Sequence, residues 1–156
     1  MPRSDRKGKK RITKPDLSYH SVLVTRFIHK VMERGKLTLA EKVVYGALER
    51  VNENKKESLD VLKKAMENVM PRVEIRPKRV GGATYQVPIP VRHDRSESLA
   101  IRWILAAAKS RKGLPTEEKL FAEIKEAASG LGAAVKKREA MHKMAEANKA
   151  FAHLRW

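Results

Sequence analysis

The stretch that decides the fold is Arg72-Val-Glu-Ile-Arg-Pro-Lys-Arg-Val-Gly-Gly-Ala-Thr-Tyr-Gln-Val-Pro-Ile-Pro-Val-Arg92. Hydrophobic residues alternate with other residues on both sides of Gly81-Gly82, which is the period of a β-strand on either side of a tight turn. The pattern therefore predicts a β-hairpin over about 73–91. Three basic residues lie toward its tip: Arg76, Lys78 and Arg79.

Helical periodicity, with apolar residues three and four positions apart, dominates the chain on both sides of the hairpin. It predicts a helix that ends at Gly35, a second whose N-cap is Thr38 in a Thr38–Glu41 capping box, and a third capped by Ser58. Three more are expected at about 95–111, from Thr116 to Gly130 or Gly132, and from about Ala133 onward. The sixth has a weak apolar stripe, so we expect it to lean on a partner.

A chain of 156 residues suits one domain, and it shows no internal repeat. The fold class predicted is mainly α, with about six helices and one protruding hairpin.

The chain carries 35 Lys and Arg against 18 Asp and Glu, a formal net charge of +17. Fourteen of these excess charges fall in residues 1–14, 72–95 and 133–156, whereas the windows between them have the mixed charges of ordinary helical surface. This placement predicts a polyanionic partner that is met at three places: an arm, the hairpin and the last helix.

The first 14 residues have almost nothing to bury and are expected to be a disordered arm that orders against phosphates. A solvated tail without function is the alternative, and a purely structural hairpin is the corresponding alternative for residues 72–92. The arm carries seven basic residues: Arg3, Arg6, Lys7, Lys9, Lys10, Arg11 and Lys14.

The sequence contains no motif that is typical of a catalytic or metal-binding site. There is no Cys, and the five His residues form neither an i, i+4 pair nor a His-Glu-x-x-His motif. Gly81-Gly82 is not followed by Lys-Ser or Lys-Thr, so it is no P-loop. We therefore expect no enzyme activity, no cofactor and no metal. No apolar run is long enough to cross a membrane, so no membrane association is expected either.

The residue types also separate the classes of polyanion. Aromatic residues make up only 5 %, too few for a membrane-surface helix or a stacking reader of single strands. Two readings remain: clamping of folded RNA at several phosphates, or bending of DNA by a β-arm. A DNA-bending protein of this kind would be a symmetric dimer, whereas for the RNA reading we expect a monomer outside its complex.

Three stretches of the chain closely resemble the family of bacterial small-subunit ribosomal protein seven. They are Met70 to Pro88, Leu99 to Ile104 and His142 to His153. The resemblance extends from about Arg3 to Trp156. It implies a six-helix domain with a hairpin that serves as a primary rRNA-binding protein in the small subunit of the cytoplasmic ribosome. Proteins of this family bind the 3′ major domain of 16S-type rRNA and nucleate assembly of the head. They lie near exit-site tRNA and mRNA, with ribosomal proteins nine and eleven as neighbours.

By position, the resemblance also implies which residues bind. For rRNA these are the seven arm residues Arg3, Arg6, Lys7, Lys9, Lys10, Arg11 and Lys14, together with Lys36, Arg72 and Arg76. Near tRNA or mRNA it places Lys78, Arg79, Gly81, Gly82, Lys136, Lys137 and Arg138. The chain divides accordingly into a basic RNA-binding arm, 1–14, and a helical domain, 15–156, that includes the 72–92 hairpin.

Overall fold

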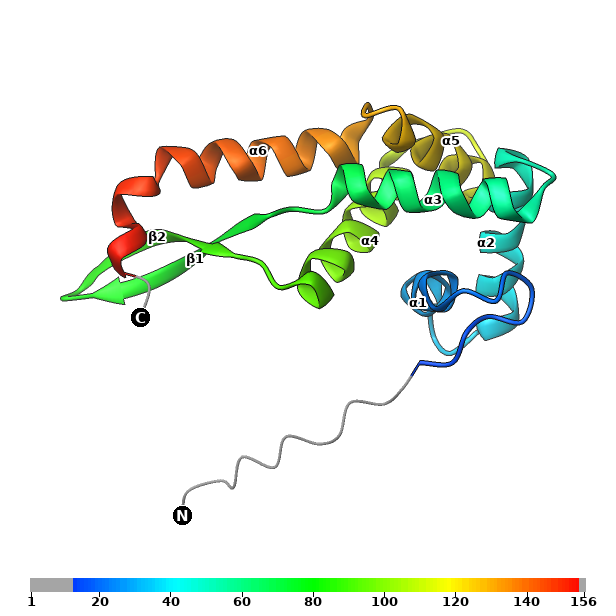
Figure 1. Ribbon diagram of the computed structural model, residues 1–156, viewed down its shortest axis with the longest axis horizontal. Helices are drawn as coiled ribbons and strands as arrows, with labels where there is room; N and C mark the ends of the chain where they lie inside the picture. The colour runs from blue at the N-terminus through cyan, green and yellow to red at the C-terminus, as the bar shows by residue number, and fades with distance from the viewer. Residues whose placement is uncertain (1–12, 155–156) are drawn as a thin grey trace, which may run out of the picture.

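The computed structural model describes residues 13–154; residues 1–12 and 155–156, and with them most of the predicted arm, lie outside the described residues. The elements in order are α1 (Val22–Val31), α2 (Leu37–Val51), α3 (Lys55–Val69), β1 (Val73–Val80), β2 (Ala83–Pro90), α4 (His93–Ser110), α5 (Thr116–Ala128), α6 (Ala133–Ala147) and a short 3₁₀ helix, η1 (Lys149–Leu154). The prediction of a mainly helical domain with one hairpin is confirmed (Figure 1).

The core lies between the helices, and α5 is its centre because α5 packs against α2, α3 and α4. Each helix buries the apolar face that its periodicity predicts. The largest fully buried hydrophobic side chains are Phe27, Leu48, Leu62, Ile101, Ile104, Leu120, Ile124, Val24, Val44, Val69 and Val87. Val87 comes from the middle of the hairpin, where it pairs with Arg76, so the ribbon is buried partway along its length.

Three predicted helix ends were wrong. The second helix begins at Leu37 with Lys36 as its N-cap, so Thr38 and Glu41 form no capping box. The third begins at Lys55, where the Asn54 side chain accepts from the Lys56 N–H at 3.1 Å. Ser58 instead lies buried inside this helix and donates to the Lys55 carbonyl. Asn is as good an N-cap as Ser, so local propensity alone could not choose between them.

The first helix ends four residues before Gly35. Its last residue is Val31, and Arg34 and Gly35 both have positive φ, at 52° and 74°, in the turn that follows. Gly35 therefore serves the tight turn into α2 and does not cap α1. The boundaries of the other predicted helices hold to within about two residues.

The prolines of the hairpin all fall where the ladder needs no donor. The Val91 N–H donates to the Arg72 carbonyl at 3.0 Å, which makes 72 and 91 a hydrogen-bonded pair. Such pairs alternate with non-hydrogen-bonded ones along an antiparallel ribbon. Pro77, Pro88 and Pro90 take part in the register pairs 77↔86, 75↔88 and 73↔90, all of the second kind. Their missing N–H groups therefore lie on the outer edges of the ribbon, where no ladder hydrogen bond is lost.

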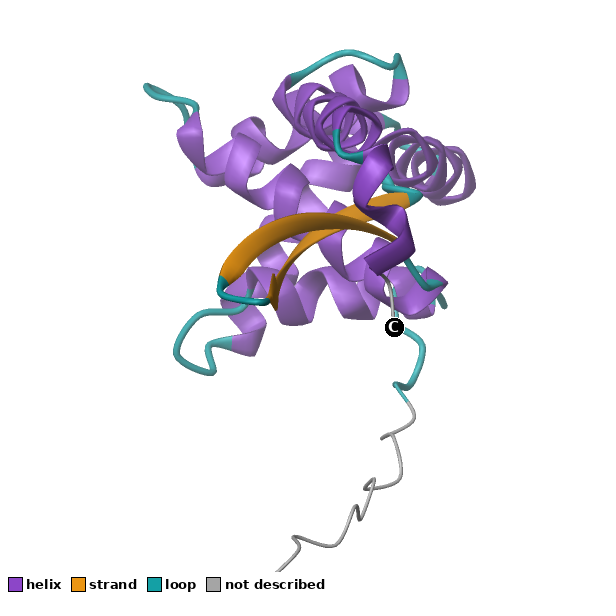
Figure 2. Cartoon of the chain, turned by 90° about the vertical axis from the view of Figure 1, so that its left-hand side faces the viewer, coloured by secondary structure: helices purple, strands orange, loops and turns teal. Residues whose placement is uncertain are grey.

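The hairpin projects from the bundle, but it does not project alone. Helix α6 runs beside it, and η1 packs on β2 (Figures 1 and 2). The rings of Tyr85 and Phe151 lie 5.2 Å apart between these two elements. The sixth helix, which was expected to lean on a partner, thus packs against the chain's own hairpin on one side and against α3, α4 and α5 in the bundle.

Candidate nucleic-acid interface

The base of the arm is fastened to the bundle by one buried carboxylate. Asp16 accepts from the backbone N–H groups of Ser18 and Tyr19, each at 2.9 Å, and from the Tyr45 hydroxyl at 2.5 Å. Burial and the hydrogen bond to Asp16 raise the pKa of Tyr45 to about 12. This contact fixes the point at which the chain leaves the helices toward its N-terminus.

Among the predicted arm residues, only Lys14 lies within the described part of the chain. Its side chain is exposed, and its carbonyl accepts from the Thr25 hydroxyl at 2.9 Å. The other six, Arg3, Arg6, Lys7, Lys9, Lys10 and Arg11, lie outside the described residues, as does the predicted disorder of the arm.

At the base of the hairpin, two arginines share one buried acid. Glu74 is 6 % exposed and receives hydrogen bonds from Arg76, at 2.6 Å, and from Arg95, at 3.1 Å. Burial by itself raises the pKa of Glu74, but these two hydrogen bonds outweigh burial and hold the pKa below its ordinary value. One acid against two partly exposed guanidinium groups leaves a surplus positive charge here. Arg95 was not among the predicted site residues, because its proximity to Glu74 arises only when α4 folds back onto β1.

Nearer the turn, the two basic residues face opposite sides of the ribbon. Lys78 pairs with Tyr85 and Arg79 with Thr84, and neighbouring residues of a strand point to opposite faces. Lys78 is half-buried on the face that carries Tyr85, whereas Arg79 is exposed on the other.

The turn itself leaves backbone open to a partner. Gly81 and Gly82 have φ of 55° and 90°, and a Cβ added at either would meet nothing within 4 Å. Positive φ at both positions suits a two-residue hairpin turn and favours glycine.

The three predicted basic residues of α6 differ in their exposure. Lys136 and Lys137 are exposed. Arg138 is half-buried and donates to the Asn68 carbonyl of α3, and it also lies 3.4 Å from Glu139. Arg138 therefore ties α6 to α3, while Lys136 and Lys137 remain available to a partner.

The structure thus brings the hairpin and α6 together into one surface, the hairpin–α6 surface, defined by Arg72, Arg76, Lys78, Arg79, Lys136 and Lys137. Arg72 is exposed, and its backbone N–H donates to His142 Nε2 of α6 at 3.1 Å. Lys36 is not part of this surface. It lies exposed in the α1–α2 turn, at the far end of the molecule from the hairpin tip (Figure 1).

The contact between His142 and Arg72 predicts a pH dependence. Burial, then the charges of Arg138 and Arg72, lower the pKa of His142 from its ordinary 6.5. The unfolded chain therefore takes up this proton first on acidification, so stability from the neutral imidazole is complete above about pH 6.5 and declines below it. We expect the urea midpoint to fall more between pH 7.5 and 5 in wild type than in His142→Gln, whose amide oxygen still accepts. Equal falls in both proteins would refute this.

Within residues 13–154, no group of His, Asp and Glu residues is arranged to hold a metal ion, and no helix is long and apolar enough to cross a membrane. Exposed Arg and Lys side chains on a ribbon and a helix, with open glycine backbone between them, are suited to phosphate groups. The fold and this surface therefore define a class: a cationic helical protein with a surface suited to the backbone of a nucleic acid.

The family can be stated as well, because the model of the ribosomal protein S7p/S5e family matches residues 2–149. The chain belongs to this family. Three bacterial proteins called small ribosomal subunit protein uS7 are close relatives. That of Fervidobacterium nodosum is 52 % identical over 97 % of this chain and 98 % of its own length. Those of Dictyoglomus thermophilum and Carboxydothermus hydrogenoformans are 58 % and 57 % identical, over 91 % and 94 % of this chain and 92 % and 95 % of their own lengths.

The chain is accordingly a structural, non-enzymatic constituent of the small subunit of the cytoplasmic ribosome, where it acts in translation in association with rRNA and other ribosomal proteins. This confirms the predicted family, the predicted class of protein, a non-enzymatic ribosomal protein, and the predicted location in the small ribosomal subunit. It also replaces the reading as a DNA-bending β-arm protein that the residue types had left open.

Proposed function

We propose that this chain is a primary rRNA-binding protein, which binds the 3′ major domain of 16S-type rRNA and nucleates folding of the small-subunit head. The observation that carries the proposal is the hairpin–α6 surface, where six basic residues and an open glycine turn lie on two elements that extend from the bundle. Its mechanism is neutralisation of phosphates from several RNA helices at once, which stabilises a junction that the RNA's own charge opposes.

The basic residues divide into two groups in this proposal. Residues 1–14, Lys36, Arg72 and Arg76 bind rRNA. The outer part of the hairpin, with Lys78, Arg79, Gly81 and Gly82, and Lys136 and Lys137 on α6 lie toward exit-site tRNA and mRNA. Arg138 contributes by holding α6 against α3, since its guanidinium already donates to the Asn68 carbonyl. Ribosomal proteins nine and eleven are the proposed neighbours, and the free protein is a monomer.

Footprinting on whole small-subunit rRNA tests the proposal. We expect protection confined to one multi-helix junction of the 3′ major domain, and size-exclusion chromatography should give a monomer. Arg72→Glu should weaken binding about tenfold or more, since it removes a phosphate contact and adds a repulsive charge. Lys63→Glu is the matched control, because Lys63 is exposed on α3 away from the surface and pairs with Asp60 at 3.0 Å. Diffuse protection, or equal losses in both variants, would instead indicate generic polyanion binding.

A further inference from the structure

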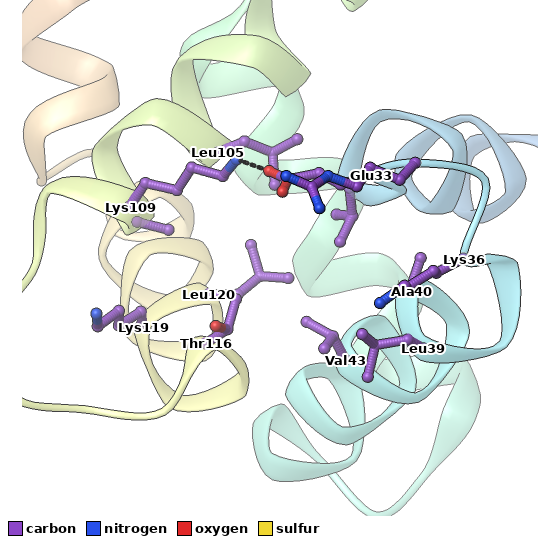
Figure 3. A pocket seen from close by; sticks show the side chains of 13 residues that line it. Glu33, Lys36, Leu39, Ala40, Val43, Leu105, Lys109, Thr116, Lys119 and Leu120 are labelled. Atoms are coloured by element: carbon purple, nitrogen blue, oxygen red, sulfur yellow. Dashed lines mark hydrogen bonds and ion pairs between the residues drawn. The ribbon is translucent and has the colours of Figure 1, made fainter.

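A pocket of about 430 Å³ lies between the α1–α2 turn, the end of α4 and the start of α5 (Figure 3). This volume is within the range of about 300–1,000 Å³ that is typical of small-molecule sites. The seven apolar residues that line it are Val31, Leu39, Ala40, Val43, Leu105, Ala108 and Leu120. Leu39 is 55 % exposed at the mouth, so its side chain is open to a ligand that enters the pocket.

Four of the six polar residues that line the same pocket are cationic, and the other two are Glu33 and Thr116. Arg34, Lys36, Lys109 and Lys119 line it, against the single acid Glu33. That acid is already paired with Lys109, on the side of the pocket opposite Lys36 (Figure 3). Arg34, Lys36 and Lys119 form no ion pair with another described residue. The pocket thus combines an apolar interior with a net positive rim.

Charge excludes two of the occupants that this chain could itself provide. The arm of residues 1–12 carries six basic residues and one acid, so the rim repels it. A second copy of a chain with net charge +17 meets the same objection. The occupant must therefore be anionic and also have a flat or compact apolar part.

We propose that this pocket receives one unstacked nucleobase of the rRNA, with the phosphates on either side of it held by Arg34, Lys36 and Lys119. The inference rests on the proposed rRNA binding and adds a second, base-contacting site to it. Unpaired bases that are turned out of an RNA fold are commonly held by stacking, and the Arg34 guanidinium offers a plane for it. Phosphates on both sides of one nucleotide account for the separated cations better than a single anion does. A duplex has no apolar group to place in the interior, because its bases are stacked inside.

A pair of leucine substitutions tests the pocket at constant charge. Leu39→Glu places a carboxylate at the mouth, and Leu131→Glu makes the same change at a leucine that is 66 % exposed between α5 and α6. Glutamate in the first turn of α2 is compatible with the helix, so both variants should keep their circular dichroism and thermal midpoint. With transcribed bacterial small-subunit rRNA as the probe, we expect Leu39→Glu to bind at least about tenfold more weakly than Leu131→Glu, the size expected for one lost stacking contact. Equal affinities would overturn the proposal.

Chemical probing of base reactivity on the same complexes then separates a base from a phosphate. One nucleotide should be protected by wild type and by Leu131→Glu but reactive with Leu39→Glu. An rRNA lacking that base but keeping its phosphates should lose affinity for wild type and lose nothing more for Leu39→Glu. Undiminished binding of the abasic RNA would overturn the assignment, since only phosphates would then be held.

An acidic peptide is the remaining occupant, and a labelled peptide of alternating Glu and Leu is its probe. If Leu39→Glu abolishes binding of this peptide but leaves rRNA affinity at the level of Leu131→Glu, the pocket is a protein-docking site and the nucleobase assignment is wrong. Failure of the proposed function looks different, because neither wild type nor Leu131→Glu would then bind the rRNA.

Discussion

Removing residues 1–12 is expected to lower the affinity for small-subunit rRNA about 100- to 1,000-fold at moderate salt, because six basic residues leave with the segment. Each phosphate contact contributes about 0.7–0.9 to the slope of log affinity against log salt, so this slope should become shallower by about four. Filter binding between 50 and 300 mM salt measures both quantities.

The same truncation should leave the fold intact. Within the described residues, this end of the chain is fastened at Lys14, whose carbonyl accepts from Thr25, and at Asp16, which accepts from Tyr19 and Tyr45. A full-length control in which the six basic residues are changed to Ser separates charge from chain length. It should lose as much affinity as the truncation. Unchanged affinity in both variants would mean that the arm is a solvated tail, and a lower thermal midpoint would mean that it packs on the bundle.

Glu123→Ala is expected to destabilise the protein by about 3 kcal/mol, because it leaves a partly buried arginine without its buried partner. Glu123 is fully buried in α5, and one of its oxygens accepts from Arg111 at 2.7 Å. The other accepts from the Ala134 N–H at 3.0 Å, in the first turn of α6. Hydrogen bonds to Glu126 and Glu123 raise the pKa of Arg111, so the guanidinium stays charged. For a domain of this size the loss corresponds to a thermal midpoint about 10 °C lower.

Two further variants identify the cause. Glu123→Gln keeps the acceptor for Ala134 but removes the charge, and should cost less than Glu123→Ala. Glu126→Gln is the matched control, because Glu126 contacts the same Arg111 at 2.6 Å but is 43 % exposed, so it should cost less than about 1 kcal/mol. Equal losses at 123 and 126 would show that the Arg111 charge, and not the link to α6, is what matters.

The hydrogen bond that links Glu123 to the start of α6 has a functional consequence that the sequence pattern does not reveal. Helix α6 begins after Gly132, where a Cβ would come within 3.1 Å of a Glu123 oxygen and φ is 93°. Glu123 and this glycine together set the direction in which α6 leaves the bundle. That direction carries Lys136 and Lys137 alongside the hairpin, so losing the link should weaken RNA binding as well as stability.

The sequence by itself determined the features that depend on local pattern. Period-two alternation around Gly81-Gly82 predicted the hairpin, and helical periodicity with a stop at Gly130 or Gly132 predicted the order of the helices, because periodicity and turn residues act over a few positions. Counting charges along the chain located the basic segments, and the resemblance to a ribosomal protein family indicated the partner. The predicted helix caps failed at Ser58, because Asn54 is an equally good N-cap within the same turn, and at Thr38, because α2 already begins directly after the Gly35 turn with Lys36 at its N-cap and no side-chain cap.

Only the tertiary structure decided which of the basic residues are available and which are used internally. Arg138 looks like Lys136 in a list of charges, yet its guanidinium donates to the carbonyl of Asn68 and holds α6 against α3, whereas Lys136 is exposed. The pocket at Leu39 is likewise made by residues of four helices, α1, α2, α4 and α5. These outcomes depend on packing between segments that are up to about 80 residues apart in the sequence. Such packing is decided by shape and burial across the whole fold, and a local window of sequence does not contain that information.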